Sequence, residues 1–537
     1  MKRLYTLFAL AMTATLSALA QWNTNANPVC IYDAAGHGDY YACNVKAART
    51  PDKKTWLSWK SWGRKEIGGR QLSAVRTYLQ LLDIDGKPQF AEPVMVNDHF
   101  TNSYWSDYGL QVAADGSAIV TVADGRAEEA SPSTESDHAE GFAPAIYKID
   151  QEGNFLWGLD GVDYPQYTQA AFTNCYVVGN DTYFIFYNNS FDDSGTADDM
   201  SNIGTFIQRI DEDGTAAWEQ PRKWSDDFIT LQIVPSTDGE FLLFDKSPNG
   251  SLVHRMNRNL EEVWGEPVLY DDHKYDGYEM NHYKLVSDGQ GGAVVAFVRT
   301  MGQFAHNIRV QHIYADGSLG FGLTGLDAAN TVDGDYDYCG VAADPDTKEI
   351  LVDFESQEET GYHVKLQKFS YDGDYLSDEL GVSIARKDLD NAYAFGRVGI
   401  GSAGDGNWIV AYRDVQAFGA NTSFIIRRYD KQGNRVWTRT IGRNLDPTNC
   451  TFCVEKEASY LFYRESSGNK NPGVTVFRIN HDGGYTVDYS TGISDVANVQ
   501  PASTARIYSL DGKLLSQPHK GLNLVRHADG TVEKRIH

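Results

Sequence analysis

The chain has 537 residues, with 47 Lys and Arg against 73 Asp and Glu, which gives a formal net charge of −26 and a pI near 4.8. Nucleic-acid binding draws most of its affinity from Lys and Arg that neutralise phosphates, so this charge argues against a nucleic-acid partner. The 50 glycines and 31 tyrosines favour a turn-rich all-β fold.

Residues 1–20 have the pattern of a secretory signal peptide. Lys2 and Arg3 precede an apolar run, and Ala18-Leu19-Ala20 forms a small-x-small cleavage site. We therefore expect a mature chain that begins at Gln21 and is secreted or held at the outer surface of the cell. No later window approaches the roughly 20 apolar residues of a spanning helix, so no transmembrane segment is expected.

Six cysteines in an exported chain suggest disulfides. The first pair flanks Asp39-Tyr40-Tyr41 and is placed to close a hairpin, and the second forms a CTFC motif. The disulfide candidates are Cys30, Cys43, Cys450 and Cys453. Cys175 and Cys339 occupy comparable positions in different repeats and are expected to be buried apolar residues. No second pair has zinc-ligand spacing, so no metal site is predicted here.

Eight short apolar runs follow one another along the chain. Each is β-branched or aromatic and is bounded by glycine or acidic turns, as buried strands are. They are Thr55–Trp62, Ser117–Ala123, Tyr183–Tyr187, Phe241–Asp245, Ala293–Val298, Ile350–Phe354, Trp408–Tyr412 and Tyr460–Tyr463. A further apolar run precedes most of them, as in Leu110–Val112 and Val398–Gly401.

A turn motif of the form apolar-x-x-[IYM]-[DNYS]-x-x-G follows each run, and an aromatic usually stands four residues after the glycine. The clearest copies are Tyr147–Trp157, Gln208–Trp218, His254–Trp264 and Arg427–Trp437. The glycine positions are Gly86, Gly153, Gly214, Leu260 in the glycine's place, Gly317, Gly373, Gly433 and Gly483. Asp or Asn at the start of the motif bonds the backbone two residues on, and Gly supplies the positive φ of a tight turn. The aromatic is predicted to cover the gap between neighbouring repeats.

Each repeat thus contains an inner strand, a second strand, a third strand that ends at the turn, and a fourth that carries the aromatic. Four antiparallel strands make one blade of a β-propeller. The sequence predicts an all-β, eight-bladed β-propeller over residues 21–490, with seven blades as the alternative.

The motif resembles the tryptophan-docking repeats of eight-bladed propellers of the pyrroloquinoline-quinone type, including outer-membrane assembly propellers that carry no cofactor. The chain departs from the quinone enzymes because it has no adjacent Cys-Cys pair and no evident calcium-binding Glu/Asn/Asp set. A quinone dehydrogenase is therefore disfavoured, and no cofactor is expected. Calcium is a weak alternative, since no complete calcium-binding loop occurs.

The loops between blades and those between second and third strands are long and share one face of a propeller. They are rich in Tyr, Asp, Asn and His, and aromatic rings beside carboxylates and amides suit a polyhydroxylated ligand. The ligand-binding candidates are Tyr104, Trp105, Asp107, His273, Tyr275, Tyr278, His282, Asp335 and Tyr336.

The chain ends in a different module. Residues 491–500 are expected to form a linker, and residues 501–537 contain three short strand patterns with Asp-Gly turns. Ala505–Leu515 and Lys520–Arg526 resemble the C-terminal sorting domain of Bacteroidetes proteins exported by the type nine secretion system. That resemblance implies contact with the secretion machinery. Its shortness and its Arg535-Ile536-His537 ending depart from the family pattern, so anchoring and release both stay open.

These observations favour a secreted or cell-surface binding module for a glycan or a surface protein. The alternative is a carbohydrate-active enzyme, a polysaccharide lyase or a glycoside hydrolase, that uses the same loops. His273 with Tyr275 is a candidate acid and base, and Asp271 with Asp272 is a candidate carboxylate pair. No G-x-S-x-G, P-loop or H-E-x-x-H motif is present, so binding is favoured over catalysis and no catalytic residue is assigned.

Overall fold

The computed structural model divides the chain into two compact units, Met1–Tyr485 and Thr486–His537. It describes residues 22–485 except 68–69, 98, 100–106, 127–130, 133–138, 141, 189–201, 248–249, 274–282, 303–304, 334–338, 379–380, 389–394, 416–421, 442–444 and 466–472. Beyond residue 485 it describes four short strands. The signal peptide and the linker predicted at 491–500 lie outside these residues.

The first unit contains eight four-stranded antiparallel sheets, the blades. Blade 1 comprises β2 (Tyr41–Arg49), β3 (Thr55–Ile67), β4 (Arg70–Leu82) and β5 (Val94–Met95). Blade 2 comprises β6 (Leu110–Val112), β7 (Ala118–Asp124), β10 (Ala143–Ile149) and β11 (Val162–Asp163), with the small hairpin β8 (Ser131–Pro132) and β9 (Ala139–Glu140) between β7 and β10. Blade 3 comprises β12 (Ala170–Val178), β13 (Asp181–Asn188), β14 (Gly204–Ile210) and β15 (Arg222–Ser225). Blade 4 comprises β16 (Thr230–Pro235), β17 (Phe241–Ser247), β18 (Gly250–Met256) and β19 (Val268–Asp271).

The remaining blades repeat the pattern. Blade 5 comprises β20 (Tyr283–Ser287), β21 (Ala293–Gly302), β22 (Ala305–Ile313) and β23 (Leu326–Asp333). Blade 6 comprises β24 (Cys339–Asp344), β25 (Glu349–Glu358), β26 (Gly361–Ser370) and β27 (Val382–Lys387). Blade 7 comprises β28 (Phe395–Gly404), β29 (Asn407–Asp414), β30 (Ser423–Tyr429) and β31 (Arg435–Ile441). Blade 8 comprises β32 (Leu445–Val454), β33 (Ala458–Glu465), β34 (Gly473–Asn480) and β1 (Val29–Tyr32), the first strand of the chain.

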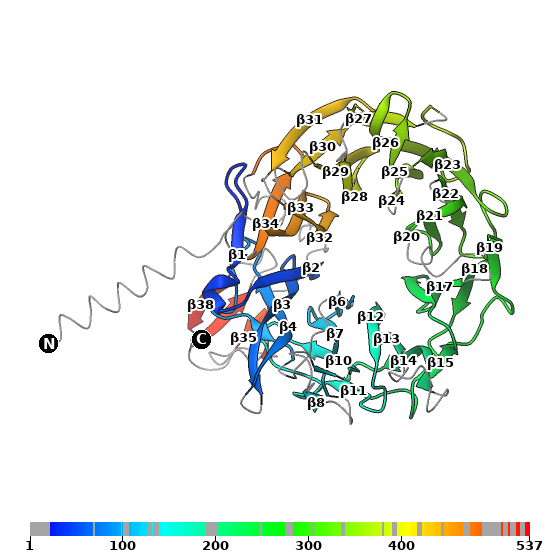
Figure 1. Ribbon diagram of the computed structural model, residues 1–537. Coiled ribbons are helices and arrows are strands. Elements are labelled where there is room, and N and C mark those ends of the chain that lie inside the picture. The colour runs from blue at the N-terminus through cyan, green and yellow to red at the C-terminus, as the bar shows by residue number, and fades with distance from the viewer. Residues whose placement is uncertain are drawn as a thin grey trace. The chain divides into compact units, whose positions relative to one another are not determined.

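The inner strands of these sheets form a closed ring (Figure 1). Each contacts the next in the order β2, β6, β12, β16, β20, β24, β28 and β32, and β32 contacts β2. The core lies between neighbouring sheets, where Val294 and Ile308 of blade 5 pack with Ile350 and Phe354 of blade 6. The predicted eight-bladed propeller is therefore confirmed, and the seven-bladed alternative is wrong.

The N-terminal segment closes this ring. β1 is antiparallel to β34, with Val29 opposite Val476, so the outer strand of blade 8 comes from the beginning of the chain. Asn23 extends the contact, since its side chain accepts a hydrogen bond from the Arg478 amide at 2.6 Å and donates to the Arg478 carbonyl at 3.0 Å. The 3-10 turn η1 (Ala35–His37) then leads into blade 1. The sequence did not indicate this closure.

The closure corrects the predicted disulfides. Cys30 lies on β1 in blade 8, whereas Cys43 lies on β2, the inner strand of blade 1, so the two do not face each other across a hairpin. Cys450 and Cys453 are three residues apart on β32, opposite Tyr463 and Tyr460. Three residues of extended strand span about 10 Å, beyond the roughly 7 Å that a disulfide tolerates between Cα atoms. Cys175 and Cys339 are buried, as expected.

The turn motif has the predicted chemistry. The Asp150 carboxylate accepts from the amides of Glu152 at 3.0 Å and Asn154 at 2.8 Å, and Gly153 has φ +88°. Leu260 takes the glycine's place at φ +59°, in the left-handed region that L-residues rarely adopt. The aromatics of Trp157, Trp218 and Trp264 precede the fourth strand instead of lying on it, which corrects the predicted position, and Trp437 alone of the four lies on its strand, β31.

The aromatic of one blade covers the turn glycine of the next blade. A Cβ placed on the glycine would lie within 2.6 to 3.4 Å of the ring in Phe90–Gly153, Trp157–Gly214, Trp264–Gly317, Phe321–Gly373, Trp437–Gly483 and Trp22–Gly86. In three pairs the indole N–H also donates to the carbonyl two residues before the glycine, at Glu212 (3.1 Å), His481 (2.8 Å) and Ile84 (2.8 Å). The predicted inter-blade role of the aromatic is confirmed, and Trp22 supplies it where the ring closes.

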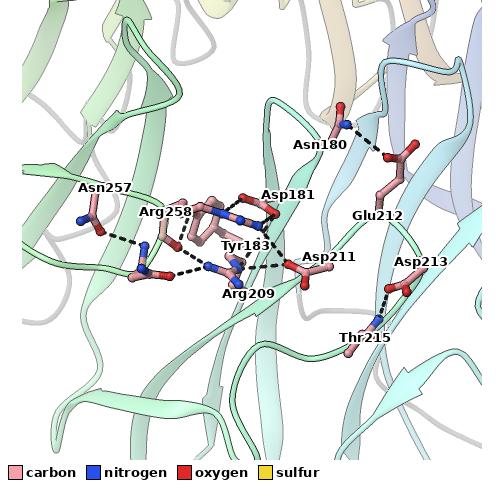
Figure 2. A network of polar contacts seen from close by, with 11 residues as sticks. Asn180, Asp181, Tyr183, Arg209, Asp211, Glu212, Asp213, Thr215, Asn257 and Arg258 are labelled. Atoms are coloured by element: carbon pink, nitrogen blue, oxygen red, sulfur yellow. Dashed lines mark hydrogen bonds and ion pairs between the residues drawn. The ribbon is translucent and has the colours of Figure 1, made fainter.

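The interface between blades 3 and 4 is held differently, at the turn that contains Leu260. The Arg258 guanidinium donates to both oxygens of Asp181, at 3.0 and 2.8 Å, and the Arg258 carbonyl accepts from Arg209 at 3.0 Å and from the Tyr183 hydroxyl at 3.1 Å (Figure 2). Arg209 also pairs with Asp211 at 3.3 Å. These charged residues join the two blades. Trp218 is only half-buried at this interface.

The second unit is a four-stranded antiparallel sheet. Its order is β36 (Leu514–Leu515), β35 (Arg506–Tyr508), β37 (Leu522–Arg526) and β38 (Val532–Ile536). Three strand patterns were predicted, and the first of them is divided into β35 and β36.

Candidate functional site

One edge of each blade carries the long loops that were predicted to hold the function. In blade 3, the strand register aligns Ala170 with Asn188, Asn188 with Gly204, and Thr205 with Ser225. The starts of the first and third strands and the ends of the second and fourth therefore lie together. We call this side of the propeller the loop face, and the opposite side, with the D-x-x-G turns, the turn face.

Most of the predicted ligand-binding residues lie outside the described residues. Seven fall within the gaps 100–106, 274–282 and 334–338, namely Tyr104, Trp105, Tyr275, Tyr278, His282, Asp335 and Tyr336. Asp107 is described and lies just before the inner strand of blade 2. His273 is described and lies half-buried beyond the outer strand of blade 4. The structure thus describes two of the nine predicted residues.

Asp107 lines a pocket of about 90 Å³ on the loop face, together with residues of blades 3 and 4. Phe172, Tyr187 and Phe228 form an aromatic group on this pocket. The Phe228 ring lies 5.2 Å from Phe172 and 5.0 Å from Tyr187, measured between centroids. His273 does not contribute to the described lining. We call these three rings, with Asp107 and Asn174, the Phe172 pocket.

Backbone irregularity places Phe172 at the surface. The register between β12 and β13 shifts between Ala171 and Asn174, which is a β-bulge, and Phe172 within it has φ +51°. A bulky residue at positive φ is strained by roughly 1–3 kcal/mol, and such strain concentrates at functional sites. The side chain is 45% exposed despite being a phenyl ring. The bulge therefore presents an apolar ring to solvent.

Polar groups border the ring on both sides. The Asp107 carboxylate is 61% exposed and pairs with the Lys46 ammonium at 2.8 Å. Burial, the largest single cause, raises the pKa of Asp107, but the charge and hydrogen bond of Lys46, the Tyr108 amide and the Lys60 charge together lower it by more. The net pKa therefore lies below the usual range, and the carboxylate is ionised at neutral pH. The Asn174 amide donates to the Tyr176 hydroxyl at 3.0 Å and accepts from the Cys175 amide at 2.9 Å.

A buried charged layer lies behind Asp107. The Tyr108 ring has the Lys46 ammonium 5.1 Å and the Lys60 ammonium 5.4 Å from its centroid, and its hydroxyl donates to the Asn44 carbonyl at 2.8 Å. Burial lowers the pKa of Lys60 to about 8, although Cys43 and Asp107 oppose the shift. Lys60 is 3% exposed and Tyr108 0%, so both fix the position of Asp107 from behind and neither reaches a ligand.

Other acidic residues of the loop face are bound to arginines. Asp124 is buried and accepts two hydrogen bonds from Arg126, at 2.7 and 3.0 Å. Asp271 and Asp272, the carboxylate pair considered for glycosidase chemistry, both bind Arg299, and Asp271 is fully buried. Both carboxylates are therefore held by one arginine in the described structure.

Among the described residues, no group of three or more His, Cys, Asp or Glu is arranged to hold a metal ion. Within the same residues, no helix has the length and apolar character that crossing a membrane requires.

Sequence reasoning missed the aromatic group of this pocket. Tyr187 ends an apolar run that is expected to be buried, whereas Phe172 lies outside the predicted runs. Phe228 lies in a short loop between blades that carries no His or Asn. The signal in the sequence is Asp226-Asp227-Phe228, an aromatic preceded by two acids just before an inner strand. The bulge at Phe172 has no signature in the sequence.

No protein-family model matches this chain, and no curated protein matches it. Solved structures match at low similarity. A protein of unknown function from Dyadobacter fermentans has 10% identity and a TM-score of 0.36, over 84% of this chain and 97% of that one. An ulvan lyase has 11% identity and a TM-score of 0.41, over 86% and 99%. An acylaminoacyl peptidase from Pyrococcus horikoshii has 10% identity and a TM-score of 0.36, over 92% and 58%. Similarity at this level gives no information about the activity or the ligand of this chain.

Proposed function

We propose that this chain is a β-propeller binding module that takes a glycan on its loop face, with the Phe172 pocket as part of the site. The observation that carries the proposal is the exposed Phe172 ring, held on a strained bulge beside Phe228, Asp107 and Asn174. The C–H face of a sugar packs on an aromatic ring, and a carboxylate and an amide take its hydroxyls. A surface protein is the second occupant that this face suits.

The charge of the chain narrows the class of glycan. The formal charge is −26, and Asp107, the acidic residue among the described residues of the pocket, is ionised. Lys46 already neutralises Asp107 locally. A uronic-acid or sulfated chain would meet net repulsion with little compensation. A neutral glycan is therefore favoured over an anionic one.

A glycan array tests the proposal with wild-type protein and two variants. Phe172→Ala removes the ring, and Tyr375→Ala removes a ring that is 38% exposed on the turn face and serves as the matched control. Binding of neutral glycans should fall with Phe172→Ala and persist with Tyr375→Ala. Equal binding by both variants, or the absence of any glycan hit, would contradict the proposed site. If the protein binds a surface protein and no glycan, and Phe172→Ala abolishes that binding, the loop face is the binding site and its ligand is a protein.

The same array separates binding from the alternative of a lyase or hydrolase. Each hit is incubated with wild-type protein, and new reducing ends are measured. We expect none, because the Phe172 pocket offers one described carboxylate, and that carboxylate is ionised and paired. Cleavage that depends on Phe172 would move the proposal to a carbohydrate-active enzyme.

Export is part of the proposal. The signal pattern of residues 1–20 and the C-terminal module of residues 501–537 support secretion to the outer surface, with the module engaging the secretion machinery. Deleting residues 501–537 should retain the protein inside the cell envelope. Unchanged arrival at the surface would show that the C-terminal module has another role.

A further inference from the structure

The interface between blades 6 and 7 lacks the ring that six other interfaces contain. Gly433, the turn glycine of blade 7, has φ +81°, and a Cβ built on it meets no heavy atom within 4 Å in the described structure. Four residues after the preceding turn glycine, Gly373, the chain has Ser377 where Trp, Phe or Tyr would be expected. The turn of blade 7 is therefore shaped for an aromatic ring that blade 6 does not supply.

A cavity of about 370 Å³ occupies this place, which we call the blade 6–7 cavity. Its apolar walls come from both blades, with Leu351 and Leu366 from blade 6 and Trp408 and Tyr429 from blade 7. The volume falls in the range of about 300–1,000 Å³ that small-molecule sites occupy. Well-packed interiors hold few voids larger than a water molecule, so this space is exceptional for an inter-blade interface.

The rim of the cavity is also apolar and open to solvent. Leu376 is 47% exposed and Val382 is 48% exposed, and both line the cavity. They follow the turn of blade 6, at the place from which a docking aromatic would arise. Exposed apolar side chains around a concave space mark binding sites.

The cavity has one carbonyl that suits an indole N–H and one buried N–H that needs an acceptor elsewhere on a ligand. In three of the six filled interfaces, the carbonyl two residues before the glycine accepts the indole N–H at 2.8 to 3.1 Å. The equivalent carbonyl here belongs to Lys431, and it accepts from the Lys368 ammonium at 3.5 Å, the long limit of a hydrogen bond. Trp408 is 2% exposed, lines the cavity, and its own Nε1 has no hydrogen-bond partner in the described structure.

We propose that the blade 6–7 cavity binds an indole ring from outside the propeller, stacked on the turn at Gly433 with its N–H directed to the Lys431 carbonyl. The ligand class is a tryptophan derivative, and the ring arrives either as a small molecule or on a peptide. Glu349 holds Lys368 at 2.8 Å, so the ammonium can remain paired when the carbonyl exchanges its weak contact for the indole N–H. This site lies on the turn face and is independent of the proposed glycan site.

The test uses N-acetyl-L-tryptophanamide as the small-molecule probe and a tryptophan-containing peptide as the second arm. Binding is measured by calorimetry and by the ligand-dependent rise in unfolding temperature. N-acetyl-L-leucinamide, which is apolar but has no indole, is the control ligand. Wild-type protein should bind the amide, the peptide or both, and should not bind the leucine control. Preference for the peptide would assign the source of the ring to a partner polypeptide.

Ser377→Trp supplies the missing ring from within. It should abolish probe binding and raise the unfolding temperature, because the new indole fills the cavity as its counterparts do elsewhere. Val382→Asp changes an exposed rim residue, so it should fold normally while it weakens probe binding. If Ser377→Trp does not fold, the binding of the probe to Val382→Asp tests the proposal by itself. Failure of wild-type protein to bind either probe, or equal binding by wild type and folded variants, overturns the proposal.

Discussion

Replacement of Trp22 by alanine should remove the contact that closes the ring. The Trp22 side chain is 3% exposed and lies on Gly86 of blade 1, where an added Cβ would be 2.6 Å from the indole. Its N–H donates to the Ile84 carbonyl at 2.8 Å, and its ring meets Tyr460 of blade 8 edge-on at 5.2 Å. Trp22 thus joins the first and last blades.

The expected loss follows from this burial. Truncation of a buried Trp to Ala lowers the free energy of unfolding by about 3–5 kcal/mol, which includes about 1 kcal/mol for the hydrogen bond. Urea unfolding measures the loss as a lower midpoint. Trp218→Ala is the comparison, because its ring is half-buried and flanked by Arg222 at 4.0 Å and Arg209 at 6.0 Å. We expect that substitution to cost about 1–2 kcal/mol. An effect of Trp22→Ala no larger than that of Trp218→Ala would refute the closing role.

Four further substitutions make three tests of residues in the turns. Gly214→Ala should lower the free energy of unfolding by about 1–3 kcal/mol more than Gly433→Ala does. Both glycines have positive φ, but only a Cβ at 214 meets an indole, that of Trp157 at 2.6 Å. Equal midpoints of urea unfolding for the two variants would argue against docking of the indole on the glycine. Lys348→Gly should raise the free energy of unfolding by about 1 kcal/mol, because Lys348 is exposed and has φ +54°, which strains any residue except glycine. A lower free energy of unfolding would show that the Lys348 side chain stabilises the fold. Burial lowers the pKa of His481 to about 4, and Arg428 adds to the shift. The unfolded chain, with a His pKa near 6.5, then binds more protons between about pH 6.5 and 4, so the free energy of unfolding falls as the pH falls through this window. His481→Gln should flatten that dependence in urea titrations at several pH values, and an unchanged slope would contradict the cause.

The number of blades could be predicted because the turn chemistry is local. Asp150 and Gly153 determine their turn through contacts within five residues, and the same contacts recur at the equivalent positions of Asp430 and Gly433. The ring closure could not be predicted in this way. β1 has four residues and pairs with a strand more than 440 residues away, and no turn motif precedes it. Long-range pairing leaves no periodic signal when the strand is this short.

The sequence predicted Asp107 and the loop face as parts of a binding site, and both stay predictions. Asp107 is recognisable because acidic and aromatic residues crowd one loop between blades. Phe172 is not recognisable, because its exposure depends on a register shift against β13 and on positive φ, and neither follows from residue type. Phe172 is a strained exception to local backbone preference. Prediction from sequence fails at such positions, and function is expected at them.

The two interfaces without an aromatic on a glycine differ in a way that bears on the blade 6–7 cavity. Between blades 3 and 4, Leu260 replaces the glycine, and the ion pairs of Arg209 and Arg258 with Asp181 hold the blades together. Between blades 6 and 7, the glycine is retained at Gly433 and the aromatic is missing. The turn at Gly433 is held by its own hydrogen bonds to the Asp430 carboxylate, so the surface on which a ring stacks is formed there without a ring. That preformed surface lies beside the apolar walls of the cavity, which is the arrangement that the proposed indole site requires.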